Sequence, residues 1–193
     1  MGKAAVLIDN GYFSKVLKYC FGEPRIDYGL LSDRLCSGWE RFRTYFYDCM
    51  PYRDDPPTDE QSRRFGDHDR FIHTLKRLDR FEVRLGKLAR NPSTGEYEQK
   101  RVDVLISVDL VRMSCAKWVD AVILVSGDSD LVPAVEAAKH EGVVTVLYYK
   151  NCDYQGQSKT KAHDELIEVC DERHEIDREL INSVSITRAA RRV

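Results

Sequence analysis

The stretch VILVSGDSD, Val122–Asp130, decides the expected fold of this chain. Its first four residues form a short apolar run, which is typical of a strand covered on both faces of a parallel sheet. Gly127 follows the strand and is expected to allow a sharp turn, and Asp128 and Asp130 come directly after it. Such a pair of carboxylates either caps the next helix or collects negative charge at the end of the strand.

The segments around this stretch predict a crossover between parallel strands. Leu131–Glu141 has a helical pattern with Pro133 in its first turn, and Val143–Tyr149 is a second buried apolar run. A strand, a helix and a strand in this order form a right-handed parallel unit. Further strands are expected at Ala4–Ile8, Arg43–Cys49 and Phe81–Leu85. The sequence therefore predicts an α/β fold, a three-layer sandwich around a central, mostly parallel, Rossmann-like sheet of about five strands.

The length of 193 residues suits one domain, which we place at residues 1–155. Residues 156–193 are expected to form a helical extension, because apolar residues recur there at helical spacing. Its last seven residues, TRAARRV, form a basic tail. The extension could pack on the core, cover an edge of the sheet or form the contact of a homodimer, and the sequence does not choose among these roles.

Composition bounds the class of protein. No apolar run approaches the roughly 18 residues that suggest a membrane span, and the first residues lack the apolar core of a signal peptide. The six cysteines include no Cys-x-x-Cys pair, which disfavours a zinc or dithiol site and favours buried free thiols. We therefore expect a protein of the reducing cytoplasm that has no membrane partner.

Charge is unevenly distributed along the chain. The formal net charge is −2, yet Gln61–Arg101 contains eleven Lys and Arg residues against six Asp and Glu residues. A locally basic surface on a mildly acidic chain suits a phosphate-rich partner such as RNA. The alternative is that these residues are ordinary solvated faces of helices.

Aspartates follow two of the predicted strands and open one of the predicted helices. Asp9 ends the first apolar run, Asp128 and Asp130 follow the central strand, and Asp103 begins the helix expected at Val102–Met113. Because the carboxyl ends of parallel strands meet at one edge of the sheet, we expect these four side chains to converge. Convergent carboxylates repel one another unless a cation neutralises them, and oxygen ligands without His or Cys favour Mg²⁺ or Mn²⁺ over zinc.

Each of these aspartates also has a structural alternative. Asp9 could cap the following helix, Asp130 could be the N-cap before the helix that follows it, and Asp103 could be a first-turn charge favoured by the helix dipole. Asp109 lies six residues beyond Asp103, about a third of a turn off its face, and is either a neighbour of the site or a surface residue. Capping needs one carboxylate of the pair, so Asp128 is the strongest candidate for a metal ligand.

Three stretches together resemble the NYN domain, and within it the LabA-like group, a branch of the PIN-like ribonuclease superfamily. They are AVLIDNGYF (5–13), KRVDVLISVDL (100–110) and ILVSGDSDLVPAVEAAKHEG (123–142). The resemblance covers about residues 4–150 and implies a metal-dependent endoribonuclease. Two positions differ from the family pattern: Tyr12 stands where many members have Asn, and Arg101 where many have Gly.

The resemblance also implies roles for single residues. The acidic catalytic positions carry over onto Asp9, Asp103, Asp128 and Asp130, of which the first three would hold Mg²⁺ or Mn²⁺. Residues that would contact RNA are Asn10, Lys100 and Arg101; the alternative for the two basic residues is the exposed end of a flap. Residues that would support the ligands are Asp109 and Ser126.

Two functions are compatible with these residues. The first is hydrolysis of RNA, expected to be single-stranded, because Tyr12, Phe13 and Tyr52 lie near strand ends and could stack on unpaired bases as well as pack in the core. The second is a catalytically silent RNA-binding or regulatory module that retains the acidic edge. A haloacid-dehalogenase phosphatase is disfavoured, because the Asp-Asn-Gly after the first strand lacks the second carboxylate which that fold requires.

Overall fold

The computed structural model describes residues 1–90, 97–154 and 157–186, with side chains except at 88–90, 97–100, 154 and 157–159. In this part of the chain, seven strands form a central sheet in the order β4-β3-β2-β1-β5-β6-β9. All neighbours in the sheet are parallel except β3 and β4. The strands are Lys3–Asp9 (β1), Glu40–Cys49 (β2), Phe81–Arg90 (β3), Tyr97–Lys100 (β4), Ala121–Val125 (β5), Val144–Tyr149 (β6) and Glu172–Glu175 (β9). Two further strands, Cys152–Tyr154 (β7) and Gln157–Thr160 (β8), pair antiparallel outside this sheet.

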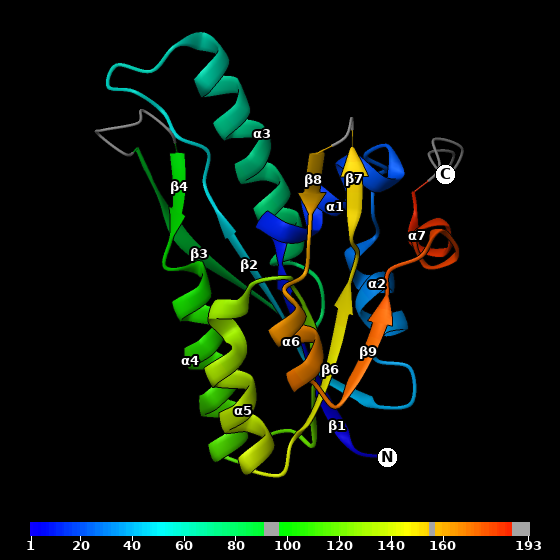
Figure 1. Cartoon of the computed structure of the whole chain (residues 1–193). Coiled ribbons are helices and arrows are strands. Elements are labelled where there is room, and N and C mark those ends of the chain that lie inside the picture. The colour runs from blue at the N-terminus through cyan, green and yellow to red at the C-terminus, as the bar shows by residue number, and fades with distance from the viewer. Residues whose placement is uncertain (91–96, 155–156, 187–193) are drawn as a thin grey trace.

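Helices cover both faces of the sheet (Figure 1). One core is built with α1 (Asn10–Phe21), α2 (Tyr28–Leu35), α3 (Asp59–Leu75) and α7 (Arg178–Val184). The opposite core is built with α4 (Val102–Cys115), α5 (Val132–His140) and α6 (Asp164–Val169). The predicted three-layer α/β sandwich is therefore confirmed. None of the helices in the described ranges is long and apolar enough to cross a membrane.

The central strand β1 explains why its sequence is a continuous apolar run. Val6 and Ile8 pack in one core, Ala5 and Leu7 pack in the other, and all four residues are fully buried. A strand covered on both faces has no solvent-facing position, so the alternation of polar and apolar residues disappears. The neighbouring strand β5 is buried along its whole length for the same reason.

The region after residue 157 contains a strand as well as the helices predicted for it. Helices α6 and α7 are separated by β9, which pairs with β6 at an edge of the sheet. All four residues of β9 are exposed, so no apolar pattern marks it as a strand. Just before β9, the Asp171 carboxylate accepts hydrogen bonds from the amide and the hydroxyl of Thr145 in β6, at 2.9 and 2.8 Å. These two hydrogen bonds hold the chain at the edge of the sheet. The domain boundary proposed at residue 155 stays a prediction.

Candidate functional site

Asp9, the last residue of β1, is fixed by hydrogen bonds to both of its carboxylate oxygens. Ile8 pairs with Val125, which places Asp9 level with the end of β5. Its Oδ1 accepts a hydrogen bond from the Tyr12 amide at 3.2 Å, and its Oδ2 accepts one from the Ser126 hydroxyl at 3.2 Å. Asp9 is thus the N-cap of α1 and also faces the end of the neighbouring strand, so its two predicted roles are compatible.

Burial dominates the electrostatics of Asp9. The residue is 7% exposed, and desolvation raises the pKa of its carboxyl from 3.8 to about 6. The amide of Tyr12 opposes this rise in pKa, whereas the charge of Asp103 adds to it. Burial likewise raises the pKa of Asp103, in the first turn of α4, and the charge of Asp128 raises it further. The negative charges of neighbouring carboxylates therefore add to the cost of burying Asp9 and Asp103.

Asp128 follows β5 and caps the single 3₁₀ turn Ser129–Leu131. Its Oδ1 accepts a hydrogen bond from the Asp130 amide at 3.0 Å. The cap considered for Asp130 is therefore made by Asp128, which retains its second oxygen for another partner. Asp130 itself is exposed, and its charge contributes to the raised pKa of Asp103.

Asp9, Asp103 and Asp128 line one cavity of about 510 Å³, which we name the acidic cavity. Gly127 lies in its wall, and a Cβ there would come within 2.5 Å of Cε2 of Tyr12 and 2.9 Å of the carbonyl oxygen of Lys161. Gly127 is thus required because three chain segments pack closely around it. The sequence instead predicts that the glycine allows a sharp turn.

Two of the predicted RNA contacts, Asn10 and Arg101, do not line the acidic cavity. Asn10 donates from Nδ2 to Oδ2 of Asp48 at 2.8 Å and lines a second cavity, between α1, α2 and α3. Arg101 is exposed before α4, with a left-handed φ of 79° that favours the glycine of the family pattern. The side chain of Lys100 lies outside the described residues, and its backbone pairs with Lys87.

The two predicted supporting residues differ in their placement. Ser126 is fully buried and donates to Asp9, as a supporting residue would. Asp109 instead accepts hydrogen bonds from the Tyr47 hydroxyl at 3.0 Å and from Nε of Arg84 at 3.2 Å. The charge of Asp109 is therefore paired with Arg84 of β3, and Asp109 does not line the acidic cavity.

The aromatic residues considered for base stacking are also used within the fold. Phe13 is buried in the core beside β1. The Tyr12 hydroxyl accepts a hydrogen bond from the Lys150 amide at 2.9 Å and donates one to its carbonyl at 3.0 Å. Tyr12 thereby ties α1 to the end of β6, while Tyr52 lines a small separate cavity beside Lys87.

Sequence reasoning missed a buried carboxylate, Asp48, near the end of β2. Its Oδ2 accepts a hydrogen bond from Nδ2 of Asn10. The same oxygen lies 3.1 Å from Nε2 of His68, but this nitrogen forms no hydrogen bond within the described part of the chain. The signal was available, because Asp48 is the second-last residue of a strand rich in aromatic residues, and Asp9 is the last residue of an apolar one. Lys161 and His163, which also line the acidic cavity, carry no local signal, since they reach it through long-range packing.

The donor set of the acidic cavity suits a hard divalent cation. Its carboxylates offer oxygen ligands, and the raised pKa values of Asp9 and Asp103 mark negative charge that a cation would stabilise. Across the described residues, no three His, Cys, Asp or Glu side chains are grouped to hold one ion. Mg²⁺ usually binds through one or two carboxylates and keeps several waters, so the residues present fit this mode of binding.

Comparisons with known proteins identify the fold and the family of the chain. The chain resembles the crystal structure of a protein of unknown function, VPA0982 from Vibrio parahaemolyticus, with a TM-score of 0.61 and 22% sequence identity. The match covers 92% of this chain and 94% of that one. It is 35% identical over 66 residues to the uncharacterized protein y4oD of Sinorhizobium fredii, covering 34% of this chain and 28% of that relative. The model of the NYN domain matches residues 3–177. The chain therefore belongs to the NYN domain family, within the PIN-like nuclease superfamily.

Proposed function

We propose that this protein is a metal-dependent endoribonuclease that hydrolyses phosphodiester bonds of RNA in the acidic cavity. The observation that carries the proposal is the convergence of Asp9, Asp103 and Asp128 from β1, α4 and the end of β5 on one cavity. Membership of a nuclease superfamily supports the same chemistry. Mg²⁺ or Mn²⁺ is the proposed ion, because the donors are carboxylate oxygens.

The residues of the chain have separable tasks in this proposal. A bound Mg²⁺ or Mn²⁺ would supply Lewis acidity at the scissile phosphate and lower the pKa of a coordinated water. Asp9, held by the Tyr12 amide and the Ser126 hydroxyl, presents its carboxylate in a fixed orientation. Asp128 uses Oδ1 as a cap and leaves Oδ2 for the ion, and Asp103 contributes from the first turn of α4.

Asp130 has a different task from the other three aspartates. It is exposed at the edge of the site, where its charge increases the local negative potential that attracts the cation. We propose single-stranded RNA as the substrate, since an open strand gives access to each phosphate. The six free cysteines support a reducing, cytoplasmic location. We further propose a homodimer, because α4 exposes two apolar side chains, Val104 and Val108, one turn apart.

A catalytically silent RNA-binding module is the second candidate. It is favoured by the lack of a ready-made three-ligand group in the described residues. The two candidates differ in one observable, because the module would bind RNA without metal and without turnover.

Cleavage of a labelled single-stranded RNA, with Mg²⁺, with Mn²⁺ and with chelator, tests the proposal. Asp128→Asn keeps the cap through its amide oxygen but loses a negative ligand, so we expect cleavage to fall by about a hundredfold or more. The matched control is Asp177→Asn: Asp177 also caps a helix, accepting the Leu180 amide at 2.8 Å, but does not line the acidic cavity. Equal cleavage by wild type and Asp128→Asn, or in chelator, would show a contaminating nuclease and refute the proposal.

A further inference from the structure

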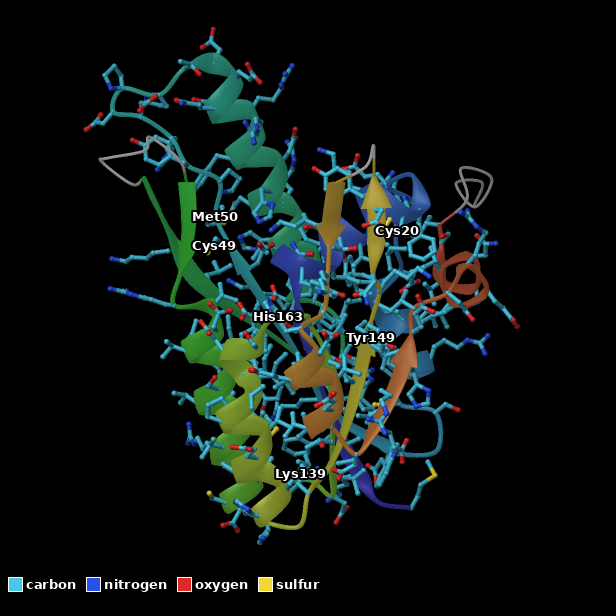
Figure 2. All side chains as sticks on the ribbon, in the orientation of Figure 1. Cys20, Cys49, Met50, Lys139, Tyr149 and His163 are labelled. Carbon is cyan, nitrogen blue, oxygen red and sulfur yellow. The ribbon has the colours of Figure 1, made fainter. Side chains whose placement is uncertain are left out.

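Three basic side chains also line the acidic cavity, and we name this part of its lining the basic wall. Lys15 reaches it from α1, and Lys161 and His163 reach it from the segment between β8 and α6. Figure 2 labels His163 at the start of α6. The acidic cavity is therefore lined both by carboxylates from β1, α4 and the segment after β5 and by basic side chains from α1 and the segment before α6.

The backbone around Ala162 explains why Lys161 and His163 point the same way. Ala162 is fully buried, whereas Lys161 and His163 are exposed, and His163 has the extended conformation φ −68°, ψ 137°. Side chains alternate along an extended chain, so the residues before and after a buried position face the same side. Both side chains therefore face the acidic cavity.

This wall is fixed to the strand end that carries Asp128. The His163 amide donates to the carbonyl of Gly127 at 3.1 Å, and the Ala162 amide donates to Oδ1 of Asn151 at 2.8 Å. The close approach of the Lys161 carbonyl to Gly127 leaves no room for a Cβ. The segment that carries Lys161 and His163 is thus tied to the strand end that carries Asp128.

The ammonium groups on this wall are available to a ligand. Three other lysines are bound to carboxylates, in the pairs Lys117–Glu141, Lys139–Asp171 and Lys150–Glu175, at 2.9, 3.2 and 2.9 Å. Within the described ranges, Lys15 and Lys161 form no such pair, although they line a cavity with three aspartates. A lysine is a flexible point charge with donors alone, which suits phosphate oxygens and carries no base specificity.

We propose that Lys15 and Lys161, with His163 beside them, bind the phosphate next to the scissile one in the RNA chain. The inference rests on the proposed function, and it narrows the substrate class to RNA with at least one phosphate beyond the scissile phosphate. In this arrangement the carboxylates would hold Mg²⁺ or Mn²⁺, and the lysines would bind the adjoining phosphate without contacting the bases. Recognition at this wall is then independent of RNA sequence.

Binding is tested by fluorescence anisotropy with a labelled single-stranded RNA, in an Asp128→Asn background that prevents turnover. Lys15→Ala and Lys161→Ala should each weaken binding about fivefold to tenfold, and each should reduce the slope of log K against log salt by about 0.7. The matched control is Lys18→Ala, which removes an exposed lysine one turn along α1 that does not line the acidic cavity. Lys161→Arg should restore most of the affinity, because it keeps the charge.

Steady-state cleavage by the otherwise native chain supplies a second readout. The lysine variants should raise KM and leave kcat near the wild-type value, since a flanking phosphate is bound equally in the ground and transition states. A dinucleotide with one phosphate should be a poor substrate for wild type and should no longer distinguish it from the variants. Lys15 and Lys161 are exposed, so unfolding temperatures should be unchanged and a folding defect would be visible.

The outcomes separate this inference from the proposed function. Metal-dependent cleavage with unchanged KM, affinity and salt slope in both lysine variants would overturn the inference and leave the nuclease intact. Loss of RNA affinity in these variants, in a protein that cleaves nothing with any metal, would support phosphate binding at the basic wall and refute the nuclease. Loss of affinity equal to that of Lys18→Ala would show a general charge effect and also overturn the inference.

Discussion

Replacing Asp9 with asparagine should stabilise the protein in the absence of divalent cations. Burial raises the pKa of Asp9 from 3.8 to about 6, which corresponds to about 3 kcal/mol of free energy against the ionised form in the folded state. A group with a raised folded-state pKa stabilises the fold below the pKa of the unfolded chain, and this contribution is lost as the pH rises through about 6. Above that pH the ionised carboxylate is a cost that asparagine removes.

The asparagine side chain should preserve the local structure. Its Oδ1 can accept the Tyr12 amide as Asp9 does, and its Nδ2 can donate to the Ser126 hydroxyl. We therefore expect the free energy of unfolding of Asp9→Asn to exceed that of wild type by about 1–3 kcal/mol at neutral pH in chelator. The gain should disappear below about pH 4, where Asp9 is protonated in both states.

Urea denaturation in chelator, at neutral and at acid pH, measures this difference. Asp27→Asn is the matched control, because Asp27 caps α2 through the Leu30 amide at 2.9 Å but is exposed. Its free energy of unfolding should stay within about 0.5 kcal/mol of wild type. An Asp9→Asn protein that is less stable than wild type at neutral pH, or equally stabilised at acid pH, would refute the raised pKa assigned to the buried carboxyl of Asp9.

Three further substitutions test the packing around the acidic cavity. Gly127→Ala should lower the free energy of unfolding by about 1–3 kcal/mol, because its Cβ would meet Tyr12 and the Lys161 carbonyl; a wild-type melting temperature would contradict this contact. Arg101→Gly should raise the free energy of unfolding by up to about 1 kcal/mol by relieving the left-handed φ of 79°, and a loss of stability in urea would show that the side chain is needed. Asp48→Ala should cost about 2–3 kcal/mol in the same assay, because the Asn10 amide loses its buried acceptor, and a neutral effect would exclude a structural role for this carboxylate.

The sequence predicts the parts of the fold that have a local signature. Strands β1 and β5 are continuous apolar runs because both faces are covered, and this pattern identifies them without any structure. Strand β9 lies at the sheet edge with four exposed polar residues, so its pairing with β6 leaves no trace in hydrophobic periodicity.

Some residues of the acidic cavity could likewise be predicted from the sequence, and others could not. The position of Asp9 and Asp128 after parallel strands predicts that they meet, because the carboxyl ends of such strands share one edge. Asn10, the next residue after Asp9, could not be placed from sequence, because the start of α1 turns its side chain towards Asp48 and away from the acidic cavity. Lys161 and His163 depend on a backbone contact with Gly127 more than thirty residues earlier, which no local pattern encodes.

A crystal of this protein soaked in Mn²⁺ tests the central claim most directly, because anomalous scattering locates the ion without reference to activity. We predict one or more anomalous peaks in the acidic cavity, in contact with Asp128 and with Asp9 or Asp103, directly or through water. A cavity that is open to solvent but contains no anomalous peak at saturating Mn²⁺ would contradict the account and favour the catalytically silent module.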